Sequence, residues 1–457
     1  MKVVVCGAGQ VGSQIARHLA GEGNDVTVID NNGALVRRLT DLYDVSGVIG
    51  FASLPDILAR AGANDCDMLI AATSMDEVNM VACQVAHSVF QVPTKIARIR
   101  TEAYLEAEWA DLFRRDHLPI DVIISPENEV ARVTLRRLNA TAAFDIEPFL
   151  DGLVNFVGIR LEEDCPVTNT PLRQLSELFS TLRARVVAVR RDGRLFSSSP
   201  EDQLFPDDEV YFVAAKEDVQ RTFGIFGKTN RAATRILVVG AGNVGLRVAR
   251  RIEDQNGQRA TMIERDRDRA ERAADRLRRT VVLNGDALDP GIFEEAGIED
   301  ADAIVALTDD DRTNLLACAL AEQIKPVISI ALAKDPIYDR LADPLDIDAL
   351  IDPRAATVSS ILRHVRRGKI RAVYSIGGGA GEVIEAQVMS TSALAGKRLR
   401  DISLPRGAIV GAVLSGGEVK MPSGDVTIGV GDVLVLFAVR DAVKKVEQMF
   451  RVSIDFF

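Results

Sequence analysis

The sequence is poor in the features that mark membrane-spanning, disulfide-bonded and metal-binding proteins. No uninterrupted apolar run approaches the roughly 20 residues that a transmembrane helix needs, so we expect no membrane-spanning segment. The five cysteines are scattered and include no Cys-x-x-Cys pair, which is typical of a reducing cytoplasm and argues against a disulfide framework or a structural zinc. The four histidines show no metal-ligand spacing either. We therefore predict a cytoplasmic protein without a metal site.

Basic residues do not outnumber acidic ones. Lys and Arg number 55 against 66 Asp and Glu, which gives a formal net charge of −11. Binding to nucleic acid relies on clustered Lys and Arg that contact phosphates, so we expect no nucleic-acid partner. With 47% hydrophobic and 26% charged residues the composition is that of an ordinary globular protein, and 457 residues suffice for roughly two to four domains.

Two glycine-rich motifs of the same form stand out in what the sequence does contain. Residues 7–12 read GAGQVG and residues 240–245 read GAGNVG, and apolar runs typical of buried strands precede them at 3–6 and 236–239. Between a strand and a helix, such glycines permit a tight turn and the close approach of a pyrophosphate, which binds at the amino end of the helix. The motifs therefore predict two nucleotide-binding loops. Their predicted binding residues are Gly7, Gly9, Gln10, Val11, Gly12, Gly240, Gly242, Asn243, Val244 and Gly245.

An acidic residue ends the next predicted strand after each motif, at Asp30 and at Glu264. The distance of about 20 residues from the motif is the one at which dinucleotide-binding units place a carboxylate on the ribose hydroxyls. We therefore predict a ribose contact from each acid, with the ending or capping of a strand as the plainer alternative. Because a carboxylate repels a 2′-phosphate, NADPH is expected to bind more weakly than NADH.

The similarity between the two halves extends well beyond the glycines. Residues 61–79 read AGANDCDMLIAATSMDEVN, and residues 296–314 read AGIEDADAIVALTDDDRTN. Short apolar runs alternate with helical patterns within each copy, which predicts βαβ units and a parallel sheet. We interpret this as the duplication of a whole domain, because the repeat is much longer than a single motif.

After each copy the pattern changes to short apolar runs separated by turn signals. Asp192-Gly193 and Gly416-Gly417 separate such runs, and both dipeptides are typical of hairpins. The predicted fold class is therefore α/β, with two Rossmann-type parallel-sheet domains that alternate with two small α+β domains. The predicted segments are a Rossmann domain at 1–124, a connecting helix at 125–150, a small domain at 151–226, a linker at 227–234, a Rossmann domain at 235–351, a connecting helix at 352–371 and a small domain at 372–457.

Further polar residues are expected at the carboxyl edge of each parallel sheet, where open sheets bind their ligands. Thr73 and Thr308 end the fourth strand of each copy, and each either contacts a ligand or satisfies the strand end. Arg98 and Arg100 share one face of the next strand, where they form either surface ion pairs or bidentate phosphate contacts. The second copy has neither arginine, so the first site is expected to prefer the more highly charged ligand, such as ATP.

These features together resemble a known family. A glycine motif, an acid after the second strand and an Ala-x-Thr-x-x-Asp-x-x-Asn stretch, followed by a small β-rich module, are similar to the RCK (regulator of K⁺ conductance) domains. Two such pairs in one chain resemble the TrkA family, the cytosolic regulatory subunits of bacterial Trk potassium-uptake systems. The resemblance implies a homo-oligomer, a tetrameric ring on the inner face of the cell membrane beneath a TrkH-type channel subunit. It also implies NAD(H) and ATP or ADP as ligands that gate K⁺ uptake.

The resemblance has consequences for two positions and two helices. RCK domains usually place a polar residue after the third strand to contact the adenine edge. Asp286 fits this role, whereas Phe51 could only stack on the base, so the two sites are expected to differ. In RCK proteins the helices that correspond to residues 127–138 and 354–365 cross to a neighbouring domain. Their apolar side chains are therefore expected either in an oligomer contact or packed within one subunit.

The sequence contains no identifiable acid–base pair of the kind that hydride transfer requires, so we predict no catalytic residues and no enzymatic activity. A NAD-dependent oxidoreductase is the alternative function, since the glycine motifs suit one. Neither Rossmann copy, however, is followed by a sizeable domain that could hold a substrate. A third alternative is that one copy is a scaffold that serves only assembly.

Overall fold

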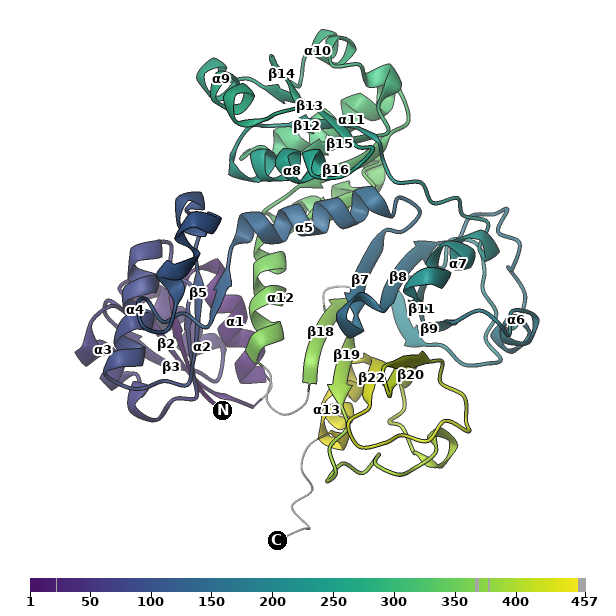
Figure 1. The fold of residues 1–457 in the computed structure, drawn as a ribbon, viewed down its shortest axis with the longest axis horizontal. Helices are drawn as coiled ribbons and strands as arrows, with labels where there is room; N and C mark the ends of the chain where they lie inside the picture. Colours follow the sequence, from purple (N-terminus) through teal and green to yellow (C-terminus); the bar gives the residue numbers. More distant parts are fainter. Residues whose placement is uncertain (22, 366–369, 377–378, 451–457) are drawn as a thin grey trace. The chain divides into compact units, whose positions relative to one another are not determined.

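The chain folds into two compact units, each built from two separate stretches of sequence (Figure 1). The structure is a computed structural model and describes residues 1–21, 23–365, 370–376 and 379–450. Unit 1 combines Met1–Leu135 with Ala233–Val365, and unit 2 combines Arg136–Ala232 with Arg366–Phe457. The two Rossmann domains thus belong to one unit and the two small domains to the other.

The first Rossmann domain is built on a six-stranded parallel sheet with the strand order β3-β2-β1-β4-β5-β6. The apolar strands β1 and β4 are almost wholly buried, as expected for a parallel sheet that is covered on both faces. The strand order reverses between β1 and β4, which is where open sheets bind ligands. Its strands are β1 (Lys2–Cys6), β2 (Asp25–Asp30), β3 (Ser46–Ile49), β4 (Met68–Ala71), β5 (Thr94–Arg98) and β6 (Val122–Ile124), and its helices are α1 (Gln10–Gly21), α2 (Gly33–Leu42), α3 (Pro55–Arg60) and α4 (Asp76–Ser88).

The second Rossmann domain repeats this arrangement, with the strand order β14-β13-β12-β15-β16-β17. The reversal point now lies between β12 and β15, again beside the glycine motif. Its strands are β12 (Arg235–Val239), β13 (Arg259–Glu264), β14 (Val281–Asn284), β15 (Ala303–Ala306), β16 (Ile328–Leu332) and β17 (Ala349–Ile351), and its helices are α8 (Asn243–Glu253), α9 (Arg267–Arg276), α10 (Pro290–Glu295) and α11 (Asp311–Ile324).

Two apolar cores hold the first sheet from its two faces. Successive residues of a strand point to opposite faces, so Val4 belongs to one core and Val3 and Val5 belong to the other. In the second domain Leu237 and Val239 contribute to a core on one face of the sheet in the same way. These cores fix the carboxyl ends of the strands, where the glycine motifs begin.

Each Rossmann domain is followed by a connecting helix that begins with proline, which suits the first turn of a helix. The first is α5 (Pro126–Asn139), and the second is α12 (Pro353–Val365). Of the predicted segment 352–371, residues 366–369 lie outside the described residues.

The second connecting helix packs on the first Rossmann domain, beside α1 (Figure 1). Val358, Ile361 and Val365 of α12 join the apolar core to which Ile15 and Leu19 of α1 belong. These three side chains therefore pack within the chain. α12 thus follows the second Rossmann domain in the sequence but packs into the core of the first.

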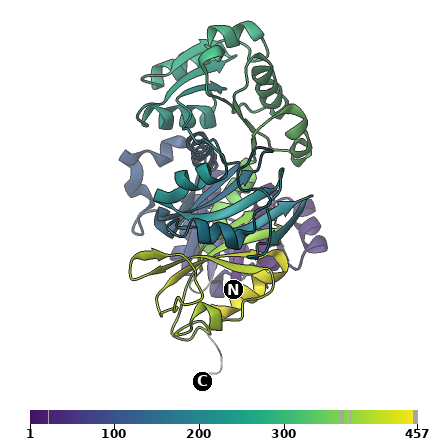
Figure 2. The ribbon, with the colours of Figure 1, turned by 90° about the vertical axis from the view of Figure 1, so that its right-hand side faces the viewer.

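Unit 2 contains two five-stranded antiparallel sheets, which lie next to each other in Figure 2. Their facing sides share one apolar core, with Phe156 and Tyr211 from the first sheet and Val383 and Phe437 from the second. The first sheet has β7 (Asp145–Phe149), β8 (Val154–Arg160), β9 (Ala184–Arg191), β10 (Arg194–Ser197) and β11 (Glu209–Ala215), and the second has β18 (Ile370–Ile376), β19 (Gly381–Gln387), β20 (Ala408–Ser415), β21 (Glu418–Lys420) and β22 (Val433–Val439). The helices are α6 (Leu172–Leu178), α7 (Val219–Ile225) and α13 (Arg440–Met449).

Parallel and antiparallel sheets thus alternate along the chain, which confirms the predicted fold class. Within the described part of the chain, no helix combines the length and the apolar character needed to cross a membrane. The described residues also include no group of three or more His, Cys, Asp or Glu placed to hold a metal ion. All five cysteines are free and buried, and burial raises the pKa of the Cys83 thiol to about 12, so that thiol stays protonated at neutral pH.

Candidate functional site

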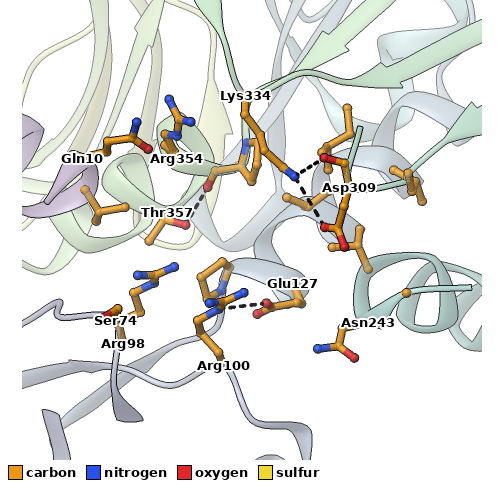
Figure 3. A pocket seen from close by; sticks show the side chains of 18 of the residues that line it. Gln10, Ser74, Arg98, Arg100, Glu127, Asn243, Asp309, Lys334, Arg354 and Thr357 are labelled. Carbon is orange, nitrogen blue, oxygen red and sulfur yellow. Dashed lines mark hydrogen bonds and ion pairs between the residues drawn. The ribbon is translucent and has the colours of Figure 1, made fainter. Parts of the chain in front are cut away.

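Both glycine motifs open into a cavity of about 1230 Å³ in unit 1 (Figure 3). Typical small-molecule pockets measure about 300–1,000 Å³, so this cavity has room for more than one ligand. It lies at the carboxyl ends of the strands in both parallel sheets. The predicted site residues that line it are Gly7, Gly9, Gln10, Val11, Asp30, Phe51, Thr73, Arg98, Arg100, Gly240, Gly242, Asn243, Val244, Glu264, Asp286 and Thr308. Gly12 and Gly245 do not line the cavity.

The third glycine of each motif serves the packing of the loop. A Cβ atom on Gly12 would lie 1.9 Å from the carbonyl oxygen of Gly7, and a Cβ atom on Gly245 would lie 1.9 Å from that of Gly240. Only glycine allows the helix and the loop to approach each other this closely.

The second glycine of each motif faces open space. A Cβ atom on Gly9 or Gly242 would meet no atom within 4 Å, and neither residue has the positive φ that favours glycine. The helices α1 and α8 begin at the next residue, Gln10 or Asn243. Their first turns present unpaired N–H groups and the positive end of the helix dipole, which together attract phosphate. Each loop is therefore shaped to hold a pyrophosphate.

The acid that ends the second strand accepts a hydrogen bond from the backbone of the glycine loop. Asp30 accepts a hydrogen bond of 2.7 Å from the N–H of Ala8 and another of 2.8 Å from that of Asn32. Glu264 accepts one of 2.7 Å from the N–H of Ala241 in the second loop. Each carboxylate oxygen can accept more than one hydrogen bond, so both acids can hold the loop and still receive a ribose hydroxyl.

A buried asparagine accounts for the position of each predicted threonine. The side-chain oxygen of Asn79 accepts from the N–H (2.9 Å) and the hydroxyl (2.7 Å) of Thr73, and its amide donates to the carbonyl of Arg98 at 2.8 Å. Asn314 holds Thr308 in the same way, at 2.8 and 2.6 Å. The asparagines join the ends of two adjacent strands, a role that the sequence prediction missed although both belong to the repeated Thr-x-x-Asp-x-x-Asn stretch.

The aspartate of the same stretch, buried in the first copy and half-buried in the second, positions the cation that follows the fifth strand. Asp76 accepts from the N–H of Arg100 at 3.0 Å, and Asp311 accepts from the N–H of Lys334 at 2.8 Å. Both cations line the cavity (Figure 3). The ammonium of Lys334 donates to the carbonyl of Asp309 at 2.8 Å, so it is already engaged within the second site.

Arg98 and Arg100 bring two guanidinium groups to the first site. Burial, followed by the nearby charge of Arg100, lowers the pKa of the Arg98 guanidinium. Its Nε is buried and has no hydrogen-bond partner among the described residues, and its Nη1 lies 3.5 Å from the carbonyl of Thr73. Arg100 lies 3.5 Å from the carboxylate of Glu127. Glu127 and Asp76 are the carboxylates near these guanidinium groups, and the buried Nε of Arg98 is left to donate to an anionic ligand.

The two predicted base-contacting residues differ in the structure as they do in the sequence. Phe51 is 55% exposed on the cavity wall and offers a ring face. Asp286 is exposed as well, and one of its oxygens accepts from the N–H of Leu288 at 3.0 Å. The second site therefore offers a hydrogen-bond acceptor where the first offers an aromatic surface.

Four arginines also line the cavity, one just before α9 and three on α9, and none was among the predicted site residues. They are Arg265, Arg269, Arg272 and Arg276. Arg276 lies 3.8 Å from the carboxylate of Glu102, whereas the other three form no ion pair with any described residue. Their spacing of four, three and four residues, directly after the acid, was the sequence signal that could have identified them.

The connecting helices bring further unpredicted residues to the cavity. Pro353, Arg354 and Thr357 of α12 line it, and Arg354 lies near Gln10 of the first glycine motif in Figure 3. This placement depends on how α12 packs against α1, so no sequence spacing could indicate it.

Comparisons with known proteins match both kinds of domain. The TrkA-N domain matches residues 3–126 and 236–353. The TrkA-C domain matches residues 156–227 and 383–451. The matched segments together cover most of the chain and repeat the alternation of the two sheet types.

The chain is also similar over its full length to individual proteins. It is 50% identical to "Trk system potassium uptake protein TrkA" of Azorhizobium caulinodans, over 100% of both chains. Among solved structures, the GsuK RCK domain covers 98% of this chain and 94% of its own, with a TM-score of 0.58 and 16% identity. A GsuK channel bound to NAD covers 98% of this chain and 78% of its own, with a TM-score of 0.58 and 17% identity. These structures share the fold.

Proposed function

Because this chain belongs to the TrkA family, we propose that it is a nucleotide-binding regulatory subunit of a potassium-uptake system, in which bound ligand gates K⁺ transport. The observation that carries the proposal is the cavity of unit 1, into which both glycine motifs open beside the amino ends of α1 and α8. Two loops of this kind in one cavity suit a sensor with two ligand sites.

The proposed ligands are NAD(H) and ATP or ADP. Each site has a phosphate-binding loop, an acid beside the ribose position and a wall for the base, which together suit an adenine nucleotide. Arg98 and Arg100 favour the more highly charged ATP at the first site. The second site, where Lys334 already binds Asp309, is the better candidate for a dinucleotide.

Gating requires that a ligand bind one arrangement of the protein more tightly than another. A nucleotide can shift such an equilibrium only by its difference in affinity for the two states. α12 supplies the means of coupling, because Arg354 at its start lines the cavity while Val358 and Ile361 lie in the core of the first Rossmann domain. A bound phosphate that attracts Arg354 would therefore favour a different position of α12, and with it a different packing of that core.

The proposed partner is a TrkH-type channel subunit, beneath which the chain assembles as a homotetrameric ring on the cytoplasmic face of the membrane. Membership of the TrkA family supports this assembly. The matching test is K⁺ flux in proteoliposomes that contain the partner channel and the full-length chain. We expect ATP or NADH to change the flux, and we expect a variant that binds no nucleotide to leave it constant. An unchanged K⁺ flux in the presence of ligands that are shown to be bound would contradict the proposal.

The proposal also distinguishes this chain from an oxidoreductase. A regulatory subunit binds NADH without consuming it, so NADH incubated with the purified protein and a panel of small carbonyl compounds should be recovered intact. Absorbance of the reduced nicotinamide measures this directly. Sustained, protein-dependent oxidation of NADH would favour the oxidoreductase.

The single substitutions Arg98→Gln and Arg100→Gln should each weaken ATP binding much more than NADH binding. A charged hydrogen bond contributes about 1.5–3 kcal/mol, so loss of either guanidinium is expected to reduce ATP affinity roughly tenfold or more. Calorimetric titration of each variant measures both ligands.

The matched control is Lys334→Gln, since this cation lines the same cavity but belongs to the second site and is held by Asp309. It should leave ATP affinity at the first site within about threefold of the original value. Equal losses of ATP affinity in all three variants would indicate a general charge effect instead of specific phosphate contacts.

A further inference from the structure

Three arginines at the ribose end of the second site have no ion-pair partner among the described residues, and they point to a ligand feature that the glycine motif alone does not specify. Arg265, Arg269 and Arg272 are called the arginine row here. We propose that the second site accepts an adenine dinucleotide with a phosphate on its adenosine ribose, of the NADPH type, and that the first site excludes it. This proposal rests on nucleotide binding by the second site and specifies the class of its ligand.

The first step of the argument is position. Arg265 directly follows Glu264, the acid at the carboxyl end of β13, and α9 begins two residues later at Arg267. Arg269 and Arg272 lie one and two turns further along the same side of the helix, and all three residues of the row line the cavity. An arginine near this acid is what accommodates the 2′-phosphate in dinucleotide-binding folds.

The second step concerns the acid itself, whose charge would otherwise repel a ribose phosphate. Glu264 is only 8% exposed. One of its oxygens accepts from the N–H of Ala241 at 2.7 Å and the other from the N–H of Asp266 at 2.8 Å. Both oxygens therefore already receive compensating donors from the backbone. Three guanidinium groups outweigh the single carboxylate at this end of the site.

The third step is that the arginine row is free to receive a ligand. None of its members forms an ion pair with a described residue, whereas Arg276 on the same side of α9 is paired with Glu102. A phosphate monoester carries nearly two negative charges at neutral pH and accepts bidentate contacts from arginine. Three guanidinium groups beside a ribose position suit such a group.

The first site shares the backbone donors to its acid, since both oxygens of Asp30 also accept from N–H groups, but it lacks the cavity-lining arginines. The residue after Asp30 is Asn31, and Leu35 takes the cavity-lining place that Arg269 has in the second copy. Asp30 is only half-buried. α2 carries Arg37 and Arg38, but neither lines the cavity, so a ribose phosphate at this site would meet the carboxylate without a cavity-lining cation from α2. The expectation that NADPH binds less tightly than NADH is therefore kept for the first site alone.

The experiment isolates the second site in the full-length chain. The substitution Gly9→Val fills the open space of the first loop, so that ligand binding reports the second site. Calorimetry with NADH, NADPH and 2′,5′-ADP then compares ligands with and without the ribose phosphate. We expect NADPH to bind at least as tightly as NADH, and 2′,5′-ADP to bind more tightly than ADP.

A double variant, Arg265→Asn with Arg269→Leu, tests the role of the arginine row. It gives the second site the residues that the first site has at these two positions. NADPH affinity should fall roughly tenfold or more, and NADH affinity by at most about threefold. The reciprocal variant, Asn31→Arg with Leu35→Arg in a Gly242→Val background, should gain NADPH affinity at the first site.

The outcomes separate this inference from the proposed function. If NADH binds the second site and NADPH binds at least tenfold more weakly, the inference is overturned while the sensor function stands. Equal losses for both ligands in the arginine variant would also overturn it, because the row would then act only through general charge. If neither dinucleotide nor any adenine nucleotide binds, both the proposed function and the inference fail.

Discussion

The substitution Gly242→Val is expected to abolish nucleotide binding at the second site without weakening the fold. A side chain on Gly242 meets no protein atom within 4 Å, and the residue has an extended backbone that valine tolerates. The new side chain occupies the space that a pyrophosphate needs for its approach to the loop. We expect a loss of about a hundredfold in affinity or more, which corresponds to about 2.8 kcal/mol.

Two further glycine variants serve as controls for this prediction. Gly9→Val should do the same at the first site and leave the second site intact. Gly245→Ala should instead disrupt folding of the second Rossmann domain, since its Cβ atom would lie 1.9 Å from the carbonyl oxygen of Gly240. Calorimetry measures binding, and thermal unfolding measures the fold. Full nucleotide affinity in the Gly242→Val protein would show that the ligand does not bind over this loop.

The substitution Asn79→Leu is expected to lower the stability of the first Rossmann domain by about 3–5 kcal/mol. Asn79 is fully buried, and its side chain holds the N–H, hydroxyl and carbonyl of Thr73 together with the carbonyl of Arg98. Leucine has a similar volume but leaves these groups without partners in a buried position. The single tryptophan, Trp109, belongs to the same domain, so its fluorescence during urea unfolding reports this domain.

The matched control lies on the same helix. Gln84 of α4 is half-buried, donates to the exposed hydroxyl of Ser88, and has an Oε1 without a partner among the described residues, so Gln84→Leu should not lower the free energy of unfolding. If Asn79→Leu and Gln84→Leu shift the fluorescence transition equally, the asparagine does not hold the two strand ends as described.

The sequence was sufficient to predict those parts of the site that depend on local patterns. The glycine motifs and the acids at Asp30 and Glu264 lie at fixed distances along one strand–turn–helix unit, so their neighbourhood in space follows from their spacing. The same holds for the two sheet types, whose apolar runs and turn signals differ. The structure brings these residues together as expected, although their contacts with a ligand stay a prediction.

The parts that the sequence could not indicate depend on tertiary packing. Arg354 reaches the first site only because α12 leaves its own Rossmann domain and packs against α1. The arginines that follow Glu264 differ from Arg354, because their regular spacing was visible in the sequence and only their place on the cavity wall required the fold. In the sequence, Asn79 and Asn314 are only members of a repeated stretch. The structure shows that their buried hydrogen bonds align the ends of two adjacent strands.

The most direct test of the account is a calorimetric titration of the full-length chain with ATP and NADH, alone and in sequence, combined with recovery of the ligands afterwards. We predict two occupied sites per chain with different preferences, ATP favoured at the site of Gly9 and the dinucleotide at the site of Gly242, and both ligands recovered unchanged. Each glycine-to-valine variant should lose one of the two sites. No binding of either ligand would leave the two glycine motifs as scaffold and contradict the sensing function.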